Sequence, residues 1–520
     1  MELIRLVETS DAVGAMASRL RKVELLADLL RQAREDEIEP LVAFLSRGPR
    51  QGRIGIGTSA IRAAVPLTSA ESASLTIKEV DEAFEALAAV KGTRSTERRV
   101  ALLRSLFERA THDEEAFLRK LLYGELRQGA LEGVLMDAVA RAAGVPAAAI
   151  RRAAMFAGDL APVARAALTQ GASGMDAYSV RLFQPVQPML ADSAPAIEDA
   201  LASTGDASVE YKIDGARIQV HKDGSDVRVY TRNLRDVTAS VPEVVEVVRA
   251  APGRTLILDG EAIALRRDGT PRPFQITMRR FGRRKDDEAL RCELPLTPLF
   301  FDCLYADGAT TIDEALARRL DLLHATAPAA NLVPHLRAPG AADADAFLSK
   351  ALAQGHEGVM VKALGAPYAA GRRGQAWLKV KQARTLDLVV LAAEWGSGRR
   401  RGWLSNLHLG ARDPERNGFV MLGKTFKGLT DEVLAWQTER FLQLEIGRDD
   451  YTVYVRPELV VEIAFSDLQE SPHYPGGLAL RFARVKRYRT DKSAADADTF
   501  ETVQKVYRAT TGQDPPPTRR

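Results

Sequence analysis

One lysine in this chain stands where a nucleophile would be needed. The segment EYKIDGAR at 210–217 places Lys212 just before an Asp-Gly pair, the dipeptide most typical of a tight β-hairpin. Apolar and polar residues alternate over 209–220, as in half-buried strands, so we predict a hairpin that holds Lys212 toward a cleft. An ordinary amine, with a pKa of about 10.4, is protonated at neutral pH, and attack requires burial or nearby cations to lower that pKa. Arg217 and later basic residues are the expected source of that field. Taken alone, the segment also fits an exposed hairpin with a solvated lysine.

Five further segments of charged and aromatic residues follow this lysine in order. They are TRN at 231–233, LDGE at 258–261, FFD at 300–302, EGVMVK at 357–362 and WLKVK at 377–381. The ordered series resembles the motifs of the covalent nucleotidyltransferase superfamily, specifically those of ATP-dependent DNA ligases, and most closely the actinobacterial ligase B type. The resemblance implies that Lys212 attacks ATP and forms a lysyl-AMP.

The same resemblance implies roles for the residues that bind the nucleotide. Glu210, on the same strand face as Lys212, binds the adenine amino group or the ribose. Arg217 and Arg232 contact the nucleotide, and a guanidinium fork suits ribose oxygens and phosphates. Phe301 stacks on the adenine ring, a contact that does not itself distinguish ATP from GTP. Outside this series, Phe301 would be interpreted as a core residue of the apolar run 296–304.

Acidic and basic residues are expected around the α-phosphate. By resemblance, Glu261 and Glu357 hold the ribose hydroxyl or Mg²⁺, an ion that takes one or two carboxylates and completes its shell with water and phosphate oxygens. Arg373, Lys379 and Lys381 resemble the basic group that grips the α-phosphate and stabilises the five-coordinate transition state.

Length and composition limit the architecture and the location of the protein. A chain of 520 residues predicts two to four domains. The net charge is only +3, but 72 Lys+Arg against 69 Asp+Glu can be segregated into a nucleic-acid surface. Two cysteines exclude a disulfide framework and a four-cysteine zinc site, and suit a reducing cytosol. No apolar run reaches the ~18–20 residues of a membrane span, and the first 15 residues lack a signal-peptide core. We expect a monomer in the cytoplasm, associated with the nucleoid if bacterial.

The first part of the chain, 1–203, is predicted to be an all-helical DNA-binding domain. Helical apolar periodicity occurs at 13–34, 82–90, 96–109, 114–126 and 134–143. The Gly- and Arg-containing segments 48–57 and 124–130 resemble phosphate-binding elements of the helical domain in larger ligases. Glycine permits close backbone approach to a phosphate, and arginine binds its oxygens. The alternative is a pair of helix-ending turns with solvated arginines. No base-reading element is recognised, so binding should not depend on DNA sequence.

Two further domains and a tail are predicted after a proline-containing connection at 180–193. Strands alternating with helices over 204–385 indicate an α/β adenylation domain. Strands at 388–391, 418–421, 451–455 and 459–464 favour an OB-fold barrel over 386–508, with basic and aromatic residues at 399–403 and 424–427 typical of a nucleic-acid surface. Residues 509–520 are expected to be a disordered tail.

The segment LRFARVKRYRTDK at 480–492 resembles the last ligase motif. By resemblance Arg481 and Arg484 orient the pyrophosphate leaving group. Ala483 replaces the usual proline, which leaves the rigidity of the turn open.

The resulting hypothesis is an ATP-dependent DNA ligase that uses Mg²⁺ and seals nicked double-stranded DNA. An RNA ligase or a GTP-dependent capping-type enzyme shares the lysine motif, but the helical domain argues against both. A NAD⁺-dependent ligase is disfavoured because no four-cysteine module follows the core. A catalytically silent DNA-binding scaffold is the alternative from another class. The sequence does not indicate whether replication, repair or end joining is served.

Overall fold

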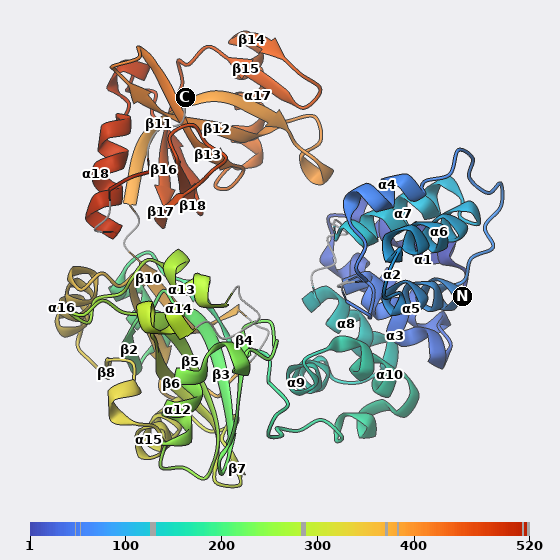
Figure 1. Cartoon of the computed structure of the whole chain (residues 1–520), viewed down its shortest axis with the longest axis horizontal. Coiled ribbons are helices and arrows are strands. Elements are labelled where there is room, and N and C mark those ends of the chain that lie inside the picture. The colour runs from blue at the N-terminus through green and yellow to red at the C-terminus, as the bar shows by residue number, and fades with distance from the viewer. Residues whose placement is uncertain are drawn as a thin grey trace. The chain divides into compact units, whose positions relative to one another are not determined.

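The computed structural model describes residues 1–46, 48–52, 54–124, 132–281, 288–369, 373–381, 384–511 and 514–516. The chain forms two compact units, of which one comprises Met1–Leu190 with Tyr368–Arg373 and the other Ala191–Pro367 with Gly374–Arg520 (Figure 1). None of the helices in these described ranges is both long and apolar enough to cross a membrane.

The first unit is helical, as predicted. Its elements are α1 (Leu3–Ala15), α2 (Arg19–Gln32), α3 (Glu35–Ser46), α4 (Thr58–Ala64), α5 (Ile77–Ala89), α6 (Ser95–Glu108), α7 (His112–Tyr123), α8 (Glu132–Ala143), α9 (Ala147–Ala157), α10 (Leu160–Gln170) and the 3₁₀ turn η1 (Gly171–Met175). The helix predicted at 13–34 corresponds to α2, but it starts at Arg19, because Met16 and Ser18 adopt extended backbone and separate α1 from α2. Capping boxes of Thr76 with Glu79 and of Thr111 with Glu114 start α5 and α7.

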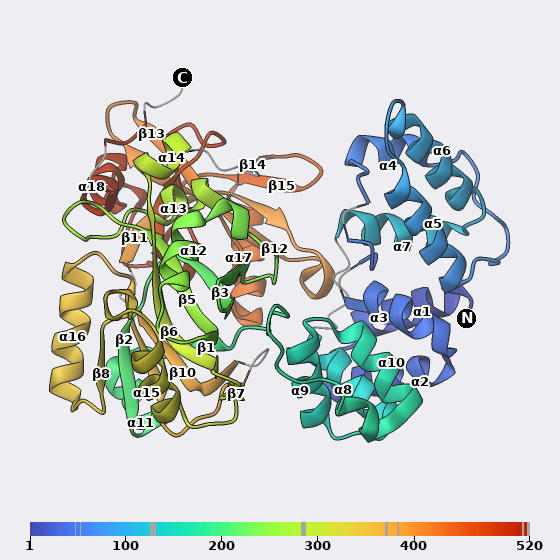
Figure 2. The ribbon, with the colours of Figure 1, turned by 60° about the horizontal axis from the view of Figure 1, so that its bottom comes forward.

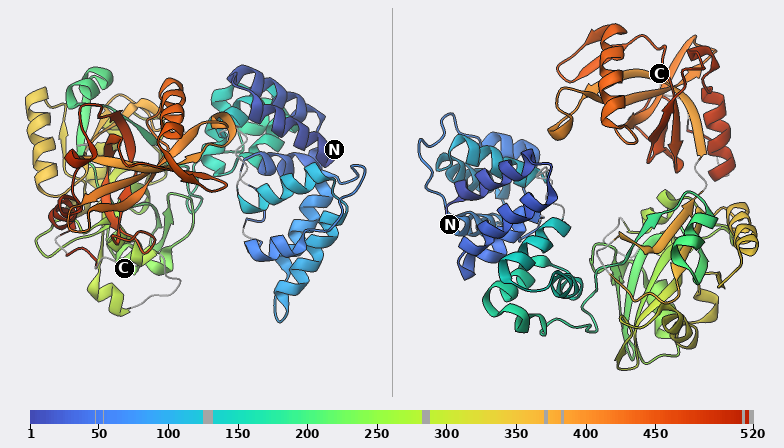
Figure 3. Two further views of the ribbon diagram at one scale, coloured as in Figure 1. Left: turned by 90° about the horizontal axis from the view of Figure 1, so that it is seen from above. Right: turned by 180° about the vertical axis from the view of Figure 1, so that it is seen from behind.

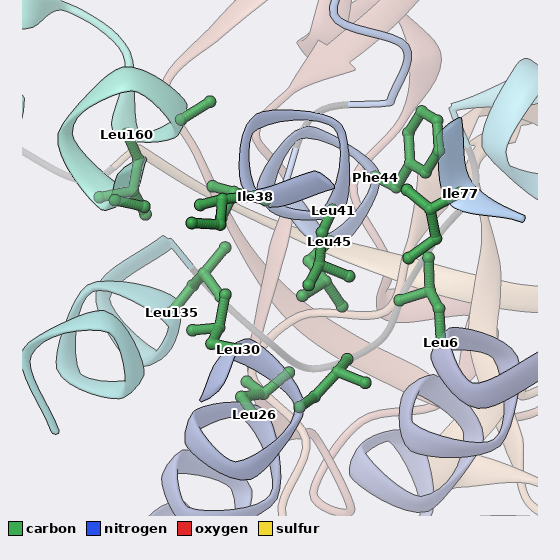
Figure 4. Close-up of a cluster of buried hydrophobic side chains, with 14 of the residues drawn as sticks. Leu6, Leu26, Leu30, Ile38, Leu41, Phe44, Leu45, Ile77, Leu135 and Leu160 are labelled. Atoms are coloured by element: carbon green, nitrogen blue, oxygen red, sulfur yellow. The ribbon is translucent and has the colours of Figure 1, made fainter. Parts of the chain in front are cut away.

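One hydrophobic core holds these helices together. Figure 4 shows Leu26 and Leu30 of α2 converging with Leu41 and Leu45 of α3, and Leu135 of α8 lies beside them. All five are buried. Their three- and four-residue spacing is the periodicity from which the helices were predicted.

The helical unit ends at Leu190, and the domain boundary at residue 203 stays a prediction. The intervening helix α11 (Ile197–Thr204) belongs to the second unit because its buried Ile197 and Ala200 join the core formed by β2 and β9. Helical periodicity alone could not show which core this helix would join.

The region predicted to be an α/β domain contains two five-stranded sheets. One has the order β1-β10-β9-β2-β8 and the other β4-β3-β5-β6-β7. The strands are β1 (Leu190–Ser193), β2 (Ala207–Tyr211), β3 (Ala216–Asp223), β4 (Asp226–Thr231), β5 (Thr255–Ala264), β6 (Leu296–Ala306), β7 (Ala309–Thr310), β8 (His335–Arg337), β9 (Gly358–Ala363) and β10 (Arg373–Lys381). The helical elements are η2 (Thr238–Ser240), α12 (Pro242–Arg249), α13 (Phe274–Phe281), α14 (Glu288–Glu293), α15 (Leu316–Thr326), η3 (Ala329–Asn331) and α16 (Ala341–Ala353). Figure 2 shows α16 beside β2 and β8, and α16 contacts β2 and β9.

The hairpin predicted around Asp214-Gly215 is wrong. β2 pairs with β8 and β9, whereas β3 pairs with β4 and β5, so the turn after Lys212 passes from one sheet to the other. Gly215 is required there, since a Cβ atom would lie 2.7 Å from the carbonyl oxygen of Ala262. Every residue of β2 is buried, so this strand is not half-buried as predicted.

The last region has the strands expected of an OB-type barrel. Its main sheet has the order β13-β12-β11-β15-β14, with β16 paired to β11 and β19, and β17 pairs with β18. The strands are β11 (Arg384–Trp395), β12 (Leu404–Asp413), β13 (Gly418–Thr425), β14 (Glu445–Arg448), β15 (Thr452–Val455), β16 (Val460–Phe465), β17 (Asp467–Glu470), β18 (Leu478–Arg481) and β19 (Arg484–Tyr488). The helical elements are η4 (Gly398–Arg400), α17 (Asp431–Gln443), η5 (Ala494–Asp496) and α18 (Phe500–Thr511). The four predicted strands lie within β11, β13, β15 and β16 apart from end residues.

Helix α18, red in Figure 3, contacts β12 and β17. Its apolar face, with buried Val503 and Tyr507, closes the core of the barrel. Residues 509–511 are the last turn of this helix, so they do not belong to a disordered tail as predicted.

Candidate active site

Lys212 lies among carboxylates at the end of β2. Its backbone is fixed on β9, because its amide donates to the carbonyl oxygen of Gly358 at 2.9 Å. Its Nζ atom lies 2.5 Å from Oε2 of Glu357, and the other oxygen of Glu357 accepts from Lys381 at 2.7 Å. The Lys212 side chain is 18% exposed. This arrangement gives the amine a fixed position with an opening toward solvent.

The carboxylates around Lys212 outweigh the expected cationic field. Burial lowers the pKa of Lys212, but the carboxylates of Glu357, Glu261 and Asp214 outweigh burial and raise it. The same ion pairs with Lys212 and Lys381 overcome the burial of Glu357 and lower its pKa. With its pKa raised, Lys212 is protonated at neutral pH, and the prediction that neighbouring basic residues lower this pKa is wrong.

Glu261 meets the turn that follows Lys212. Its Oε2 atom accepts from the amide of Gly215 at 2.8 Å. Burial raises the pKa of Glu261 to about 7, although Lys212 and Arg217 act in the opposite direction. A bound cation would favour the ionised form, so this carboxylate is suited to a metal.

Glu210 is buried on β2 and carries an ion pair that the sequence did not predict. Its Oε2 atom lies 2.5 Å from Nζ of Lys362 on β9, and its Oε1 atom accepts from Oγ of Ser208 at 3.1 Å. Burial raises the pKa of Glu210, and Lys362 opposes that rise. Lys362 lies inside the segment 357–362 but received no role, because strand pairing rather than spacing brings it to Glu210.

Phe301 lies in an aromatic and cationic cluster. Its ring meets that of Trp377 edge-on, with centroids 6.0 Å apart. Lys362 Nζ lies 4.2 Å and the Arg217 guanidinium carbon 5.3 Å from the Phe301 centroid. Arg217 is held by Asp259, whose oxygens accept from it at 3.0 and 2.6 Å. A base stacked on Phe301 would therefore lie beside two cations.

Three further residues were predicted to bind the nucleotide. Arg232 is exposed just after β4. Lys379 lies on β10 opposite Met360, two residues from Lys381 and half-buried. The side chain of Arg373 lies outside the described residues.

Arg481 reaches the turn after Lys212. It ends β18, and its Nη1 atom donates to Oδ2 of Asp214 at 2.8 Å. Its guanidinium carbon lies 4.2 Å from the centroid of the Phe274 ring. Arg484 is exposed and lines a cavity of about 660 Å³ together with Asp214, Glu357 and Lys381. Both arginines of the last motif are thus near the carboxylates around Lys212.

The turn between these arginines is fixed without proline. Phe482 adopts a left-handed φ of 57°, and the carbonyl oxygen of Ala483 accepts from Oγ1 of Thr425 at 2.6 Å. Ala483 itself is buried, so packing and this hydrogen bond hold the turn.

The structure describes only part of the two glycine- and arginine-containing segments of the helical unit. Arg50 binds both oxygens of Asp81 at 2.8 and 2.6 Å and Glu85 at 3.0 Å, an internal contact that favours the structural alternative for this arginine. Gly48, Gly52 and Gly55 have φ values of 102°, 69° and 73°, which explains glycine at these turns. Arg53 and residues 125–131 lie outside the described residues.

Comparison with known proteins identifies related sequences. Three family models match: "DNA ligase N terminus" over 63–140, "ATP dependent DNA ligase domain" over 188–381 and "ATP dependent DNA ligase C terminal region" over 400–492. A probable DNA ligase of Anaeromyxobacter sp. (strain Fw109-5) is 58% identical, over 98% of both chains. One of Mycobacterium marinum is 53% identical, over 98% of this chain and 100% of the relative.

A solved structure, Pmar-Lig_PreS3, supports the fold. It covers 93% of this chain and 99% of its own with a TM-score of 0.61, at 18% identity. The predicted sequence of a helical domain, a nucleotidyltransferase domain and an OB-type domain is confirmed. The narrower likeness to the ligase B type stays a prediction. Since relatives above 50% identity match almost its whole length, the chain belongs to the ATP-dependent DNA ligase family.

Proposed function

We propose that this DNA ligase seals nicks in duplex DNA through a covalent AMP on Lys212. In the first step the neutral amine of Lys212 attacks the α-phosphorus of ATP, an N–P bond forms, and the P–O bond to pyrophosphate breaks. In the second, the 5′-phosphate of the nick takes the AMP and frees the lysine. In the third, the 3′-hydroxyl attacks that phosphate, closes the strand and releases AMP.

The observation that supports this proposal is the placement of the Lys212 amine. It lies 2.5 Å from Glu357, and Lys381 lies 2.7 Å from the same carboxylate, so two cationic side chains converge on one point. Phosphoryl transfer depends mainly on in-line positioning and charge neutralisation. Because the surrounding carboxylates raise the pKa of Lys212, we infer that its proton leaves only once those carboxylates are neutralised, as a cation held by Glu261 and Glu357 would do.

The remaining residues have separable proposed tasks. Glu210 and Phe301 bind adenine, and Arg217 and Arg232 bind the ribose and phosphates. Arg373, Lys379 and Lys381 neutralise the α-phosphate, while Arg481 and Arg484 orient the leaving pyrophosphate.

Mg²⁺ is proposed as the metal, held by Glu261 and Glu357. Among the described residues no group of three or more His, Cys, Asp or Glu side chains forms a complete metal site. Two carboxylates near Lys212 fit an ion that takes most of its ligands from water and phosphate. When bound, such an ion would supply positive charge at the α-phosphate.

Domain limits of 1–203, 204–385 and 386–508 stay predictions, as do the monomeric state and the cytoplasmic location. The helical unit is proposed to bind the DNA backbone without reading the sequence of bases.

A pulse and chase tests the proposed order of steps. The enzyme is incubated with α-³²P-labelled ATP, freed of nucleotide, and then given nicked DNA. We expect the label to move from protein to the DNA 5′-phosphate and then to free AMP, with one sealed nick per AMP released. Label that stays on the protein while nicks are sealed would contradict the proposal.

A further inference from the structure

Lys362 is a buried cation that the chemistry at Lys212 does not use. The residue is 1% exposed. Its Nζ atom lies 2.5 Å from Glu210 Oε2 and 3.4 Å from the carbonyl oxygen of Phe301. The same atom lies 4.2 and 4.3 Å from the ring centroids of Phe301 and Trp377. A carboxylate, a carbonyl group and two aromatic rings thus surround one ammonium group.

The pairing of Lys362 with Glu210 is poorly explained by stability alone. Taking two charges out of water costs several kcal/mol per ion, and well-packed apolar residues in place of a buried pair are often as stable or more stable. Glu210 and Lys362 stand on the neighbouring strands β2 and β9, whose backbone pairing does not require charged side chains. The pair is better understood as fixing the position and ionisation of Glu210 beside Phe301.

We propose that Lys362 sets the base selectivity of the nucleotide site by holding Glu210 as a carboxylate that can only accept hydrogen bonds. The inference rests on the proposed binding of adenine by Glu210 and Phe301. Adenine presents an amino donor where guanine presents a carbonyl acceptor. An ionised carboxylate accepts from the amino group and repels the carbonyl, whereas a protonated carboxyl can donate to the carbonyl. Lys362 is therefore a positioning residue, acting on the base through Glu210.

Among the charged groups around Glu210, Lys362 has the largest effect in keeping this carboxylate ionised. Burial raises the pKa of Glu210, and the closest opposing charge is Lys362. His335 on β8 also opposes the rise, and Asp302 on β6 adds to it. Asp302 is itself paired with Arg319, so its influence is partly compensated. Without Lys362, burial would leave Glu210 protonated over a wider pH range.

The variant Lys362→Met tests the inference through the rates at which it forms the covalent nucleotide from ATP and from GTP. Single-turnover formation of the protein-bound nucleotide is measured with each α-labelled triphosphate from pH 6 to 9. The ATP-to-GTP rate ratio should fall about tenfold to a hundredfold at pH 6, the effect of losing one hydrogen bond to a charged group. It should recover toward the wild-type ratio as pH rises and Glu210 ionises, while the wild-type ratio stays constant. A variant that keeps the wild-type ratio at every pH would overturn the inference.

Lys222→Met is the matched control. Lys222 is a buried lysine of the same region, 5% exposed, whose Nζ donates to the carbonyl oxygen of Ala251 at 2.5 Å. Loss of selectivity in this control as well would assign the effect to packing and overturn the inference.

A double variant, Glu210→Gln with Lys362→Met, removes both charges of the pair, so no buried charge is left unpaired. It replaces the single variant if the single variant does not fold. It should accept GTP as well as ATP with no pH dependence of the ratio, and retained ATP selectivity would count against the role of this pair. Wild-type enzyme that takes no label from ATP would instead contradict the proposed function.

Discussion

Arg319→Met should destabilise the adenylation region strongly, because it leaves Asp302 as an uncompensated buried charge. Both side chains are 0% exposed, and the oxygens of Asp302 accept from Arg319 at 2.7 and 3.1 Å. Arg319 also donates to the carbonyl oxygens of Glu314 at 2.6 Å and Ala366 at 3.0 Å. Removing one partner of a fully buried pair costs about 3–5 kcal/mol of unfolding free energy.

A surface ion pair with the same distance between nitrogen and oxygen provides the control. Arg337 lies 2.7 Å from Asp321, but the two side chains are 45% and 52% exposed. Solvent screens that pair, so Arg337→Met should cost about 0–1 kcal/mol. The comparison separates burial from the loss of an ion pair, since the two charged groups are of the same kind at the same distance.

The assay is urea unfolding followed by the fluorescence of Trp377. This residue is the only one of the four tryptophans before residue 386, so replacing Trp395, Trp403 and Trp436 by Phe leaves a probe of the adenylation region. Both arginine variants are compared in that background. Adding Asp302→Leu to Arg319→Met should recover part of the loss, because no buried charge then remains unpaired. Equal losses in the two single variants, or a loss below about 1 kcal/mol for Arg319→Met, would refute the reasoning.

Three further predictions concern the other regions. Although burial opposes its ionisation, hydrogen bonds from lysine, histidine and asparagine side chains lower the pKa of Glu394 from 4.5 to about 2, so its stabilising effect is present above pH 4.5 and is lost as pH falls toward 2. Glu394→Gln should therefore lower the melting temperature at pH 7 and change it less at pH 3; an equal drop at both would contradict the pKa assignment. Arg481→Ala and Arg484→Ala should form lysyl-AMP orders of magnitude more slowly, since alignment of the leaving group supplies several kcal/mol, yet should seal a pre-adenylated nick at near wild-type rate in single-turnover assays. Equal loss on both substrates would place these arginines on DNA instead. Removing residues 1–190 should weaken nicked-DNA binding far more than self-adenylation, and binding by the intact protein should fall steeply with salt; unchanged nick affinity in the truncated protein would refute this assignment.

The regular elements could be predicted because their signals are local. Helical periodicity and the capping residues of α5 and α7 lie within a few positions of one another, and the strands of the barrel alternate over short runs. The break between α1 and α2 was missed because Met16 and Ser18, which take extended backbone there, are neither glycine nor proline.

The site was predicted as a set of residues but not as a set of contacts. The order of the segments led to Lys212, Glu210 and Glu357, yet the partners of these side chains depend on which strands pair. Asp-Gly suggested a hairpin, but the chain changes sheets there, which places Lys212 against Glu357 and Glu210 against Lys362. Contacts between residues some 150 positions apart leave no local signal in one sequence, so the ion pairs of Lys212 with Glu357 and of Glu210 with Lys362 could not be anticipated.

The central claim, that Lys212 carries the AMP, is tested most directly by locating the label. Enzyme incubated with α-labelled ATP is digested and the modified peptide is identified by mass spectrometry, in parallel with Lys212→Ala and Lys212→Arg. We expect AMP on Lys212 in the wild type and none in either variant, because alanine has no amine and a guanidinium stays protonated. Both variants should still bind nicked DNA. A covalent AMP retained by Lys212→Ala, or found on another residue of the wild type, would contradict the assignment.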